Sequence, residues 1–336
     1  MLVPPDLTAG AIGARLRAEY GVRVASVTFL PLGADPHSAV YRIVADDGTA
    51  YFLKLRRGPF AEAGVAVPRF LHDRGIAPVS APLATGAGRL WTRVGDFTAS
   101  VAPFIAGRNG FEEPISARGW AALGAALGGM HRATLPPALA ALLPREDFGP
   151  RWREALRAFV ARAEADTFAE PVVARLAATL RAERATIARL VGRAEMLAAG
   201  LRARPPANVL CHADIHAGNV VIDDAGALHI VDWDTAMLAP KERDLMFIGA
   251  GIGDDWRGPG PEALFYEGYG EAAIDRAALA YYRCERIVED LAVFCEELLP
   301  TDAGGPDREV SLGFVLGQFA PDGVIAIALG TGWGES

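Results

Sequence analysis

The sequence has few cysteines and no long apolar run, and each scarcity excludes a class of protein. Its 336 residues include only 3 cysteines, whose number and spacing fit neither a disulfide framework nor a zinc site. We therefore expect a reducing compartment, the cytoplasm. No apolar stretch approaches the length that spans a bilayer, and residues 1–5 do not begin a signal peptide. No membrane partner is expected.

The sequence also lacks a strong charge of either sign. Its 33 Lys and Arg stand against 41 Asp and Glu, which gives a net charge of −8. This sign disfavours nucleic acid and anionic membranes as partners, and it is compatible with a small cationic ligand. The chain has no internal repeat, and its 51% of hydrophobic residues is enough for a two-lobed globular enzyme.

Oxygen-bearing side chains are concentrated in two short segments, residues 211–219 (CHADIHAGN) and 232–234 (DWD). A hydroxyl that attacks the γ-phosphate of ATP needs a carboxylate to orient it and accept its proton, and Asp214 can supply one. Mg²⁺ needs oxygen ligands beside the phosphates, and Asn219 and Asp232 offer a carboxamide oxygen and a carboxylate. The order His-x-Asp-x-x-x-x-Asn is that of kinase catalytic loops. The two segments therefore predict phosphoryl transfer.

Short apolar runs predict buried strands around these segments, at residues 208–211, 220–222 and 228–231. Residues 223–226 would turn the last two strands into a hairpin. Asp214 and Asn219 would then share one loop, and Asp232 would follow the hairpin. Asp and Asn also occur in ordinary turns, but the strand-loop-strand context favours the catalytic interpretation.

On these residues the chain resembles the aminoglycoside phosphotransferase family, the antibiotic-modifying branch of the kinase-like enzymes. The family's loop reads His-x-Asp-x-x-x-x-Asn, with a second Asp 18 residues after the catalytic one, and here 232 − 214 = 18. The longer runs, residues 212–220 and 232–249, are similar to the spectinomycin-modifying members. The resemblance implies an α+β, protein-kinase-like fold of two lobes, a small β-rich N-terminal lobe and a larger, mainly helical C-terminal lobe.

The resemblance further implies that residues 1–102 form a lobe that binds ATP. Residues 49–55 alternate like a strand, with Lys54 expected to face opposite to Phe52. In the family a Lys at this position pairs with the α- and β-phosphates, although edge strands also carry solvated Lys residues. A helix Glu usually pairs with that Lys, and Glu62 is the nearest candidate.

Residues 31–41 stand where the family has its phosphate-covering hairpin, but they hold only Gly33. The family tolerates such loops because Ser residues or backbone amides can contact the phosphates. Ser38 is a candidate phosphate contact here, and an ordinary hairpin turn is the alternative.

Residues 103–336 would form the catalytic and substrate-binding lobe, joined to the first lobe by a hinge over about residues 102–107. The hinge backbone should recognise adenine through the carbonyl of Pro103 and the amide of Ile105, since proline has no N–H. Amphipathic periodicity predicts helices in this lobe over residues 118–132, 151–165, 169–203 and 275–299. We interpret His131, in the first of these helices, as a packed core residue.

Four further polar residues lie near the predicted site in the sequence. His212 has no obvious proton to move if Asp214 is the base, so we interpret it as a structural residue that anchors the loop. His216 could contact phosphate or water, or be a solvated loop residue. Asp234 could approach a second Mg²⁺ or an amine of the substrate, or cap the following turn. Asp244 resembles the family residue that braces the catalytic loop.

A cleft for a polyhydroxylated cation needs converging carboxylates. Asp254 and Asp255 are candidates, and so are Glu285 and Glu289 on the last of the predicted helices. Glu285 and Glu289 are four positions apart and therefore share a helix face. A solvated charged face is the alternative interpretation for each residue taken singly.

The sequence thus predicts an ATP- and Mg²⁺-dependent O-phosphotransferase for a small aminocyclitol or aminoglycoside antibiotic, of the spectinomycin type, and hence a part in antibiotic resistance. A choline, homoserine or sugar kinase of the same fold is one alternative, and a nucleotide-binding pseudokinase that serves as a partner module is another. The sequence leaves open whether the protein is a monomer or homodimer, whether it prefers ATP or GTP, which hydroxyl is modified, and whether residues 324–329 form a final helix or a dimer contact.

Overall fold

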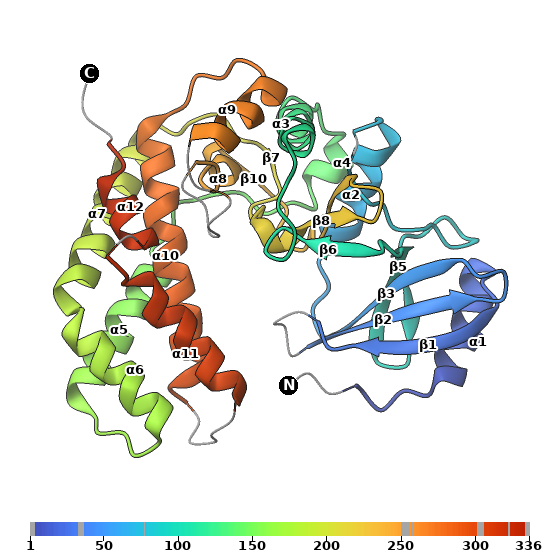
Figure 1. The fold of residues 1–336 in the computed structure, drawn as a ribbon, viewed down its shortest axis with the longest axis horizontal. Helices are drawn as coiled ribbons and strands as arrows, with labels where there is room; N and C mark the ends of the chain where they lie inside the picture. Colours follow the sequence, from blue (N-terminus) through green and yellow to red (C-terminus); the bar gives the residue numbers. More distant parts are fainter. Residues whose placement is uncertain are drawn as a thin grey trace. The chain divides into compact units, whose positions relative to one another are not determined.

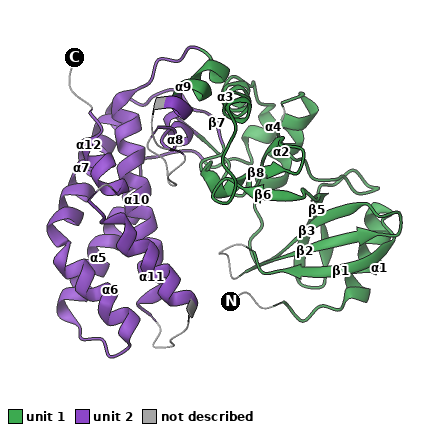
Figure 2. Ribbon diagram, in the orientation of Figure 1, with its two compact units in different colours: residues 1–144, 212–238, 263–270 green, residues 145–211, 239–262, 271–336 purple. Residues whose placement is uncertain are grey.

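The structure is a computed structural model that describes residues 4–32, 37–76, 78–249, 256, 259–300, 306–321 and 323–332. The chain is a mixed α+β protein with a small antiparallel sheet and a helical part, which confirms the predicted kinase-like fold class (Figure 1). It divides into two compact units (Figure 2). Unit 1 comprises residues 1–144, 212–238 and 263–270, and unit 2 comprises residues 145–211, 239–262 and 271–336.

Unit 1 contains a five-stranded antiparallel sheet in the order β1-β2-β3-β5-β4. Its strands are β1 (Val24–Leu30), β2 (Ser38–Ala45), β3 (Ala50–Arg57), β4 (Thr92–Val94) and β5 (Phe97–Pro103). Leu53 and Leu55 of β3 are buried in one apolar cluster with Ile12 and Leu16 of α1 (Ala9–Tyr20). Because alternate residues of a strand share a face, Lys54 projects from the opposite face of the sheet.

The expectation that Lys54 faces opposite to Phe52 is wrong. The two residues are two positions apart in β3, so their side chains lie on the same face of the strand. The residues that face the other way are Leu53 and Leu55, which are fully buried.

The strands around the predicted loop form a second sheet of unit 1, in the order β6-β8-β9. These strands are β6 (Gly107–Asn109), β8 (Val220–Asp223) and β9 (Leu228–Ile230). The hairpin of β8 and β9 is confirmed, with Val220 opposite Ile230. Two short strands lie where the chain passes from one unit to the other, β7 (Val209–Cys211) and β10 (Met237–Ala239).

The helices of unit 1 include α2 (Ala63–Asp73), α3 (Ala117–His131) and α4 (Pro137–Ala140), and most of α9 (Pro259–Tyr269). The helix predicted over residues 118–132 is α3. His131 is buried, and its Nδ1 lies 2.7 Å from the hydroxyl of Tyr269, as a packed core His requires.

Unit 2 is helical and has its own apolar core. Its helices are α5 (Arg151–Ala165), α6 (Pro171–Ala182), α7 (Arg184–Ala203), α8 (Glu242–Leu245), α10 (Arg276–Leu298), α11 (Pro306–Gln318) and α12 (Val324–Gly330). The single helix predicted over residues 169–203 is two helices, because the backbone at Glu183 leaves helical geometry, with φ −94° and ψ 9°. Ile325 and Ala328 of α12 are buried in the core, which confirms the helix alternative for residues 324–329.

Within the part of the chain that the structure describes, no helix has both the length and the apolar character that crossing a bilayer requires. The predicted lobe boundary at residue 102 is a different division from the two compact units, and it stays a prediction.

Candidate active site

The loop of unit 1 that carries Asp214 and Asn219 is held by its own backbone. The amide of His216 donates to the carbonyl of Asp214 at 3.0 Å, and the amide of Asn219 donates to the carbonyl of His216 at 2.9 Å. A 3₁₀ turn, η1 (Ala217–Asn219), then leads directly into β8. Ala213 has a φ of +69°, a left-handed conformation that costs free energy in any residue except glycine. This turn directs the chain so that Asp214 and Asn219 fall on one loop.

The side chain of Asn219 holds Asp214. Its Nδ2 donates to the carbonyl oxygen of Asp214 at 2.8 Å and lies 3.3 Å from the carboxylate Oδ2 of the same residue. Both contacts are made by the amide nitrogen, so the amide oxygen Oδ1 is directed elsewhere. Asn219 can therefore position the carboxylate of Asp214 and still offer an oxygen to a cation.

Asp232 lies at the same end of the β8–β9 hairpin as Asn219. The amide of Val231 donates to the carbonyl of Asn219 at 3.0 Å, which places Asp232 one residue beyond that hydrogen bond. Asp232 has a φ of +59°, so the chain leaves β9 through a second left-handed turn. A carboxamide oxygen and a carboxylate at one strand end are a donor set that fits Mg²⁺.

Lys54 of β3 contacts the segment that follows β9. Its Nζ is 2.9 Å from Oδ1 of Asp232 and 2.8 Å from Oδ2 of Asp234. Burial opposes the charge on Lys54, but the carboxylates of Asp232 and Asp234 outweigh it and raise the pKa of this residue. Lys54 is therefore a fixed cation beside the candidate metal ligand.

His212 links the loop to the end of β9. Its Nε2 lies 2.9 Å from the carbonyl of Val231, and its Nδ1 accepts from the amide of Asp214 at 3.3 Å. The buried ring packs against Trp233 with a centroid separation of 4.6 Å. The hydroxyl of Thr235 donates to the His212 carbonyl at 2.9 Å. These contacts join His212, which precedes Asp214, to residues on both sides of Asp232.

His216 lies between Asp214 and an aromatic ring. Its Nδ1 accepts from the amide of Gly218 at 3.0 Å, so the proton of the neutral ring is on Nε2, which is 3.6 Å from Oδ2 of Asp214. Phe111 stacks on the ring at 5.8 Å. Sequence reasoning missed Phe111, and an exposed aromatic in a loop gives no signal of such a contact.

Comparison with known proteins decides the family. A family model described as the phosphotransferase enzyme family matches residues 27–282. The chain belongs to this family. Spectinomycin phosphotransferase APH(9)-Ia in complex with ADP and spectinomycin is 36% identical, with 97% of this chain and 99% of that chain covered and a TM-score of 0.90. Its AMP-bound complex is 35% identical over the same shares of both chains, with a TM-score of 0.86.

An amicoumacin kinase in complex with AMP-PNP, Ca²⁺ and its antibiotic is 16% identical over 96% of this chain and 94% of that chain, with a TM-score of 0.63, and shares the fold alone. Among curated proteins, none matches the chain. These relationships confirm the predicted enzyme class, a phosphotransferase with an alcohol group as acceptor. ADP is bound in the first of the two spectinomycin phosphotransferase structures and AMP in the second.

The lysine of this phosphotransferase does not pair with the predicted helix glutamate. Among the residues that the structure describes, the ion partners of Lys54 are Asp232 and Asp234, and Glu62 is not one of them. Glu62 is exposed at the N-cap of α2. The expected pair is therefore corrected. Its candidate was chosen by sequence distance, whereas the actual partners are 178 and 180 residues away in the chain.

The predicted adenine contacts lie just after β5. Pro103 is the last residue of that strand, and the next amide, that of Phe104, donates to the carbonyl of Ala50 at 3.1 Å. Within the described ranges the Ile105 amide is bonded to no other group. Ser38 is the first residue of β2 and is half-buried. The roles of Pro103, Ile105 and Ser38 toward a nucleotide stay predictions.

The acidic residues predicted for the substrate divide into three groups. Asp234 is the Lys54 partner described above, and Asp254 and Asp255 lie outside the described residues. Glu285 is 5% exposed in unit 2, where its carboxylate accepts from Nη1 of Arg153 at 2.5 Å. Burial raises the pKa of Glu285 to about 6 although Arg153 opposes the shift. The Glu285 carboxylate is thus used inside unit 2, contrary to the expectation that it faces a ligand.

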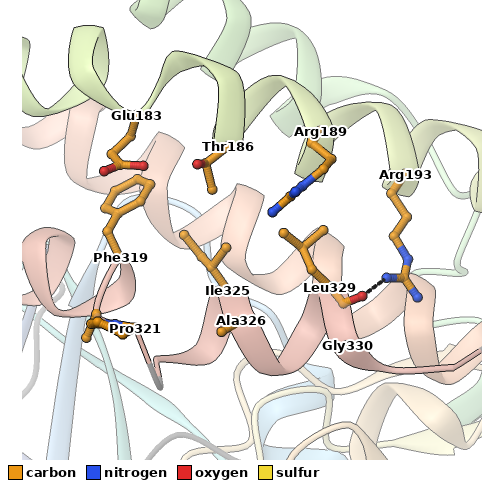
Figure 3. A pocket seen from close by; sticks show the side chains of 11 residues that line it. Glu183, Thr186, Arg189, Arg193, Phe319, Pro321, Ile325, Ala326, Leu329 and Gly330 are labelled. Carbon is orange, nitrogen blue, oxygen red and sulfur yellow. Dashed lines mark hydrogen bonds between the residues drawn. The ribbon is translucent and has the colours of Figure 1, made fainter.

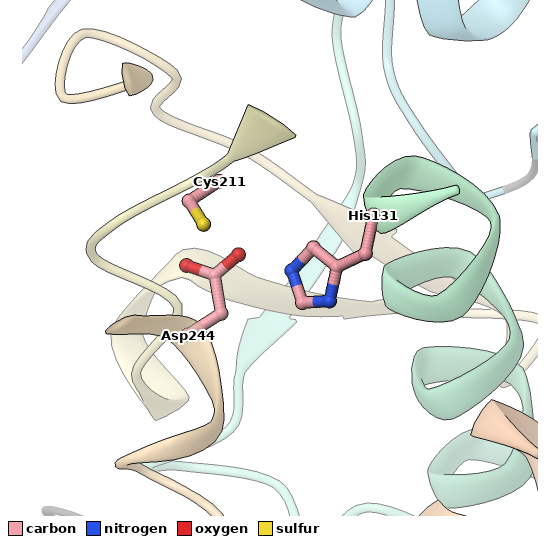
Figure 4. A group of neighbouring side chains, drawn as sticks. All are labelled: His131, Cys211 and Asp244. Carbon is pink, nitrogen blue, oxygen red and sulfur yellow. The ribbon is translucent and has the colours of Figure 1, made fainter. Parts of the chain in front are cut away.

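Glu289 and Asp244 also have partners within unit 2. Glu289 lies 3.4 Å from Nη2 of Arg243. Asp244 of α8 is fully buried, and its carboxylate points toward the sulfur of Cys211, within 4.8 Å (Figure 4). Burial and the charge of Asp244 raise the pKa of the Cys211 thiol. That Asp244 braces the catalytic loop stays a prediction.

A cavity of about 610 Å³ lies within unit 2 (Figure 3). Side chains of α7, among them Arg189 and Arg193, line one side. The other side is lined by Phe319, Ala320, Pro321, Ile325, Ala326, Leu329 and Gly330. Arg193 donates to the carbonyls of Leu329 and Thr331, which fixes the end of α12. The cavity contains none of the predicted site residues, so it does not bear on the phosphotransferase site.

Proposed function

We propose that this family member uses ATP and Mg²⁺ to phosphorylate a hydroxyl of spectinomycin or a closely related aminocyclitol. The observation that supports the chemistry is the pair of contacts that the amide nitrogen of Asn219 makes with Asp214, at 2.8 Å to its carbonyl and 3.3 Å to its carboxylate. These contacts lie at the end of the β8–β9 hairpin that is followed by Asp232. The substrate class rests on the 36% identity to a spectinomycin phosphotransferase over 97% of this chain. Modification of such an antibiotic would give resistance to it.

In this proposal Asp214 is the general base. Its carboxylate would accept a hydrogen bond from the acceptor hydroxyl and take the proton as the oxygen attacks phosphorus. The Asn219 amide keeps the carboxylate from rotating, and His212 keeps the loop at the end of β9. The main contribution of the protein would be a fixed orientation of the base and the acceptor hydroxyl, because phosphoryl transfer needs little covalent chemistry from the protein.

The remaining residues would hold the nucleotide. Asn219 and Asp232 would bind Mg²⁺, which when bound neutralises charge on the phosphate oxygens. Lys54 would contact the α- and β-phosphates, and Ser38 would contact phosphate. The Ile105 amide and the Pro103 carbonyl would pair with adenine. Residues 1–102 and 103–336 would then be the nucleotide-binding and catalytic lobes.

Substrate recognition would depend on acidic residues around the site. The net charge of −8 favours a cationic acceptor over an anionic one. Asp254, Asp255 and Glu289 are the proposed contacts for the amines. Glu285 is left out because its carboxylate is buried against Arg153, whereas the side chain of Glu289 is 26% exposed beside Arg243.

The proposal is tested by a coupled assay of ADP release with spectinomycin as acceptor, and by the mass of the product. We expect steady turnover and a product that gains one phosphoryl group. Aminoglycosides, choline, homoserine and a sugar form the comparison panel. Faster turnover of a panel member than of spectinomycin would overturn the substrate assignment, and absence of turnover with every acceptor would favour the pseudokinase alternative.

A further inference from the structure

The ammonium of Lys54 lies between two carboxylates of one short segment. Its Nζ is 2.9 Å from Asp232 and 2.8 Å from Asp234, distances typical of charge-assisted hydrogen bonds. The side chain of Lys54 is 24% exposed and that of Asp234 is 35% exposed, against 52% for Asp232. The pair with Asp234 is thus the better shielded of the two, and shielding from water strengthens an ion pair.

Asp234 is also contacted by a second cation of β3. Nη1 of Arg56 lies 3.5 Å from the same Oδ2 that contacts Lys54. Arg56 and Lys54 are two positions apart in β3, so both cations project from one face of the sheet toward one carboxylate. Asp234 therefore has a defined place and is not a free turn residue.

The backbone of α2 lies against Asp234 from another direction. A Cβ built on Gly64 would stand 2.8 Å from Oδ1 and 3.3 Å from Cα of Asp234. The first distance is shorter than real side-chain contacts, so a larger residue at position 64 would force the carboxylate of Asp234 to shift. The helix expected to supply a glutamate to Lys54 instead supplies a surface on which the aspartate sits, while Glu62 is exposed.

We infer that Asp234 is the residue that positions the nucleotide-binding lysine, in place of a helix glutamate. The inference rests on the proposed function only in that Lys54 contacts the phosphates of a nucleotide. Asp232 is the proposed metal ligand, so Asp234 is the carboxylate that remains to hold Lys54. One backbone segment then sets the places of both the lysine and the metal ligand.

Two substitutions of a carboxylate by its amide distinguish the possible partners. Asp234→Asn removes the proposed partner, and Glu62→Gln removes the one expected from the family. We measure the affinity for ADP by calorimetry, with and without Mg²⁺, and the KM values for ATP and for the acceptor. We expect Asp234→Asn to weaken ADP binding about tenfold, the size of one lost charge-assisted bond, and Glu62→Gln to change it less than about twofold.

A double-mutant cycle shows whether Asp234 acts through Lys54. In a Lys54→Met background, Asp234→Asn should weaken ADP binding by less than about twofold, because the residue that it positions is gone. The KM for the acceptor should stay within about twofold in Asp234→Asn. A full loss in the Lys54→Met background, or a raised KM for the acceptor alone, would show that Asp234 contacts another ligand and would overturn the inference.

Gly64→Ala is a second variant that keeps both charges. Its methyl group would displace the carboxylate of Asp234, so we expect weaker ADP binding there and no further loss when it is combined with Asp234→Asn. Alanine is the better helix former, so a gain or no change in thermal stability together with weaker binding separates positioning from misfolding. Unchanged ADP affinity in both Gly64→Ala and Asp234→Asn would contradict the inference.

Failure of the inference and failure of the proposed function give different results. ADP binding requires no acceptor, so weakened binding in Asp234→Asn supports the inference even if spectinomycin is not phosphorylated. Turnover of spectinomycin together with normal ADP affinity in Asp234→Asn would overturn the inference and keep the function. A wild-type protein that binds no ADP would overturn both.

Discussion

Asn219 donates through one amide nitrogen to both the backbone carbonyl and the carboxylate of Asp214, at 2.8 and 3.3 Å. The residue proposed to bind the metal is thereby also the residue that orients the proposed base. A substitution at either position should therefore affect the chemical step, and the two effects should not be additive.

Asp214→Asn tests the proposed base. The amide keeps the shape of the side chain but cannot accept the proton, so kcat should fall at least about a hundredfold while ADP affinity stays within about twofold. Steady-state kinetics and calorimetry measure the two quantities. His229→Gln serves as a control that should keep kcat, because this residue of β9 contacts Asp223 in the same hairpin. Near-normal turnover in Asp214→Asn would exclude it as the base.

Asp232→Asn tests the proposed metal ligand. A neutral amide binds Mg²⁺ more weakly than a carboxylate, so the Mg²⁺ concentration that gives half-maximal turnover should rise at least about tenfold. The control is Asp223→Asn in the same hairpin, where the carboxylate accepts from the amides of Ala225 and Ala227 and contacts His229. An equal shift in both variants would point to a general effect of charge.

Arg153→Leu tests the buried ion pair of unit 2. Arg153 is 1% exposed and donates to Glu285 and to the carbonyls of Phe148 and Gly149, so its loss leaves a buried carboxylate unpaired. The free energy of unfolding should fall by about 3 to 5 kcal/mol. Arg157→Leu is the matched control in the same helix.

The control pair of Arg157 with Glu195 is about half exposed on both sides, so its loss should cost less than about 1 kcal/mol. Denaturant unfolding at pH 7 measures both variants. Equal losses in the two would mean that burial does not decide the strength of these pairs.

Glu285→Gln tests the pH dependence of stability. Burial raises the pKa of Glu285 to about 6 from its ordinary value of 4.5, so the folded protein binds this proton more tightly than the unfolded chain. The stability that this protonation contributes is complete below about pH 4.5 and is lost as the pH rises through about 6. The glutamine variant lacks the titration.

Between pH 4.5 and pH 7, the wild type should therefore lose about 2 kcal/mol of stability relative to Glu285→Gln. Denaturant midpoints measured across this range give the difference. A difference that does not vary with pH, or that changes in the opposite sense, would contradict the raised pKa.

Local signals were enough to select the candidate catalytic loop. Asp214, Asn219 and Asp232 could be selected from the sequence because a short motif and alternating apolar runs specify a loop and a hairpin within about twenty residues. The alternation of β3 was also present in the sequence, although the side of Lys54 was assigned incorrectly relative to Phe52.

Long-range partners could not be selected in this way. Glu62 was the nearest acidic residue to Lys54 in a predicted helix, but Asp234 is the residue that packs against both Lys54 and Gly64. Glu285 had the pattern of an exposed helix face, and only the packing of Arg153 against it shows that it is buried. The stacking of Phe111 on His216 likewise could not be predicted from the spacing of residues in the sequence.

The sequence by itself determined the family, the class of chemistry and the loop proposed to carry it, because backbone geometry and hydrophobic alternation act between residues that are close in the chain. Only the tertiary structure decided which carboxylate holds Lys54 and which acidic residue is used inside the core. Those choices depend on distances between segments more than a hundred residues apart, where burial and charge pairing, rather than local pattern, set the free energy.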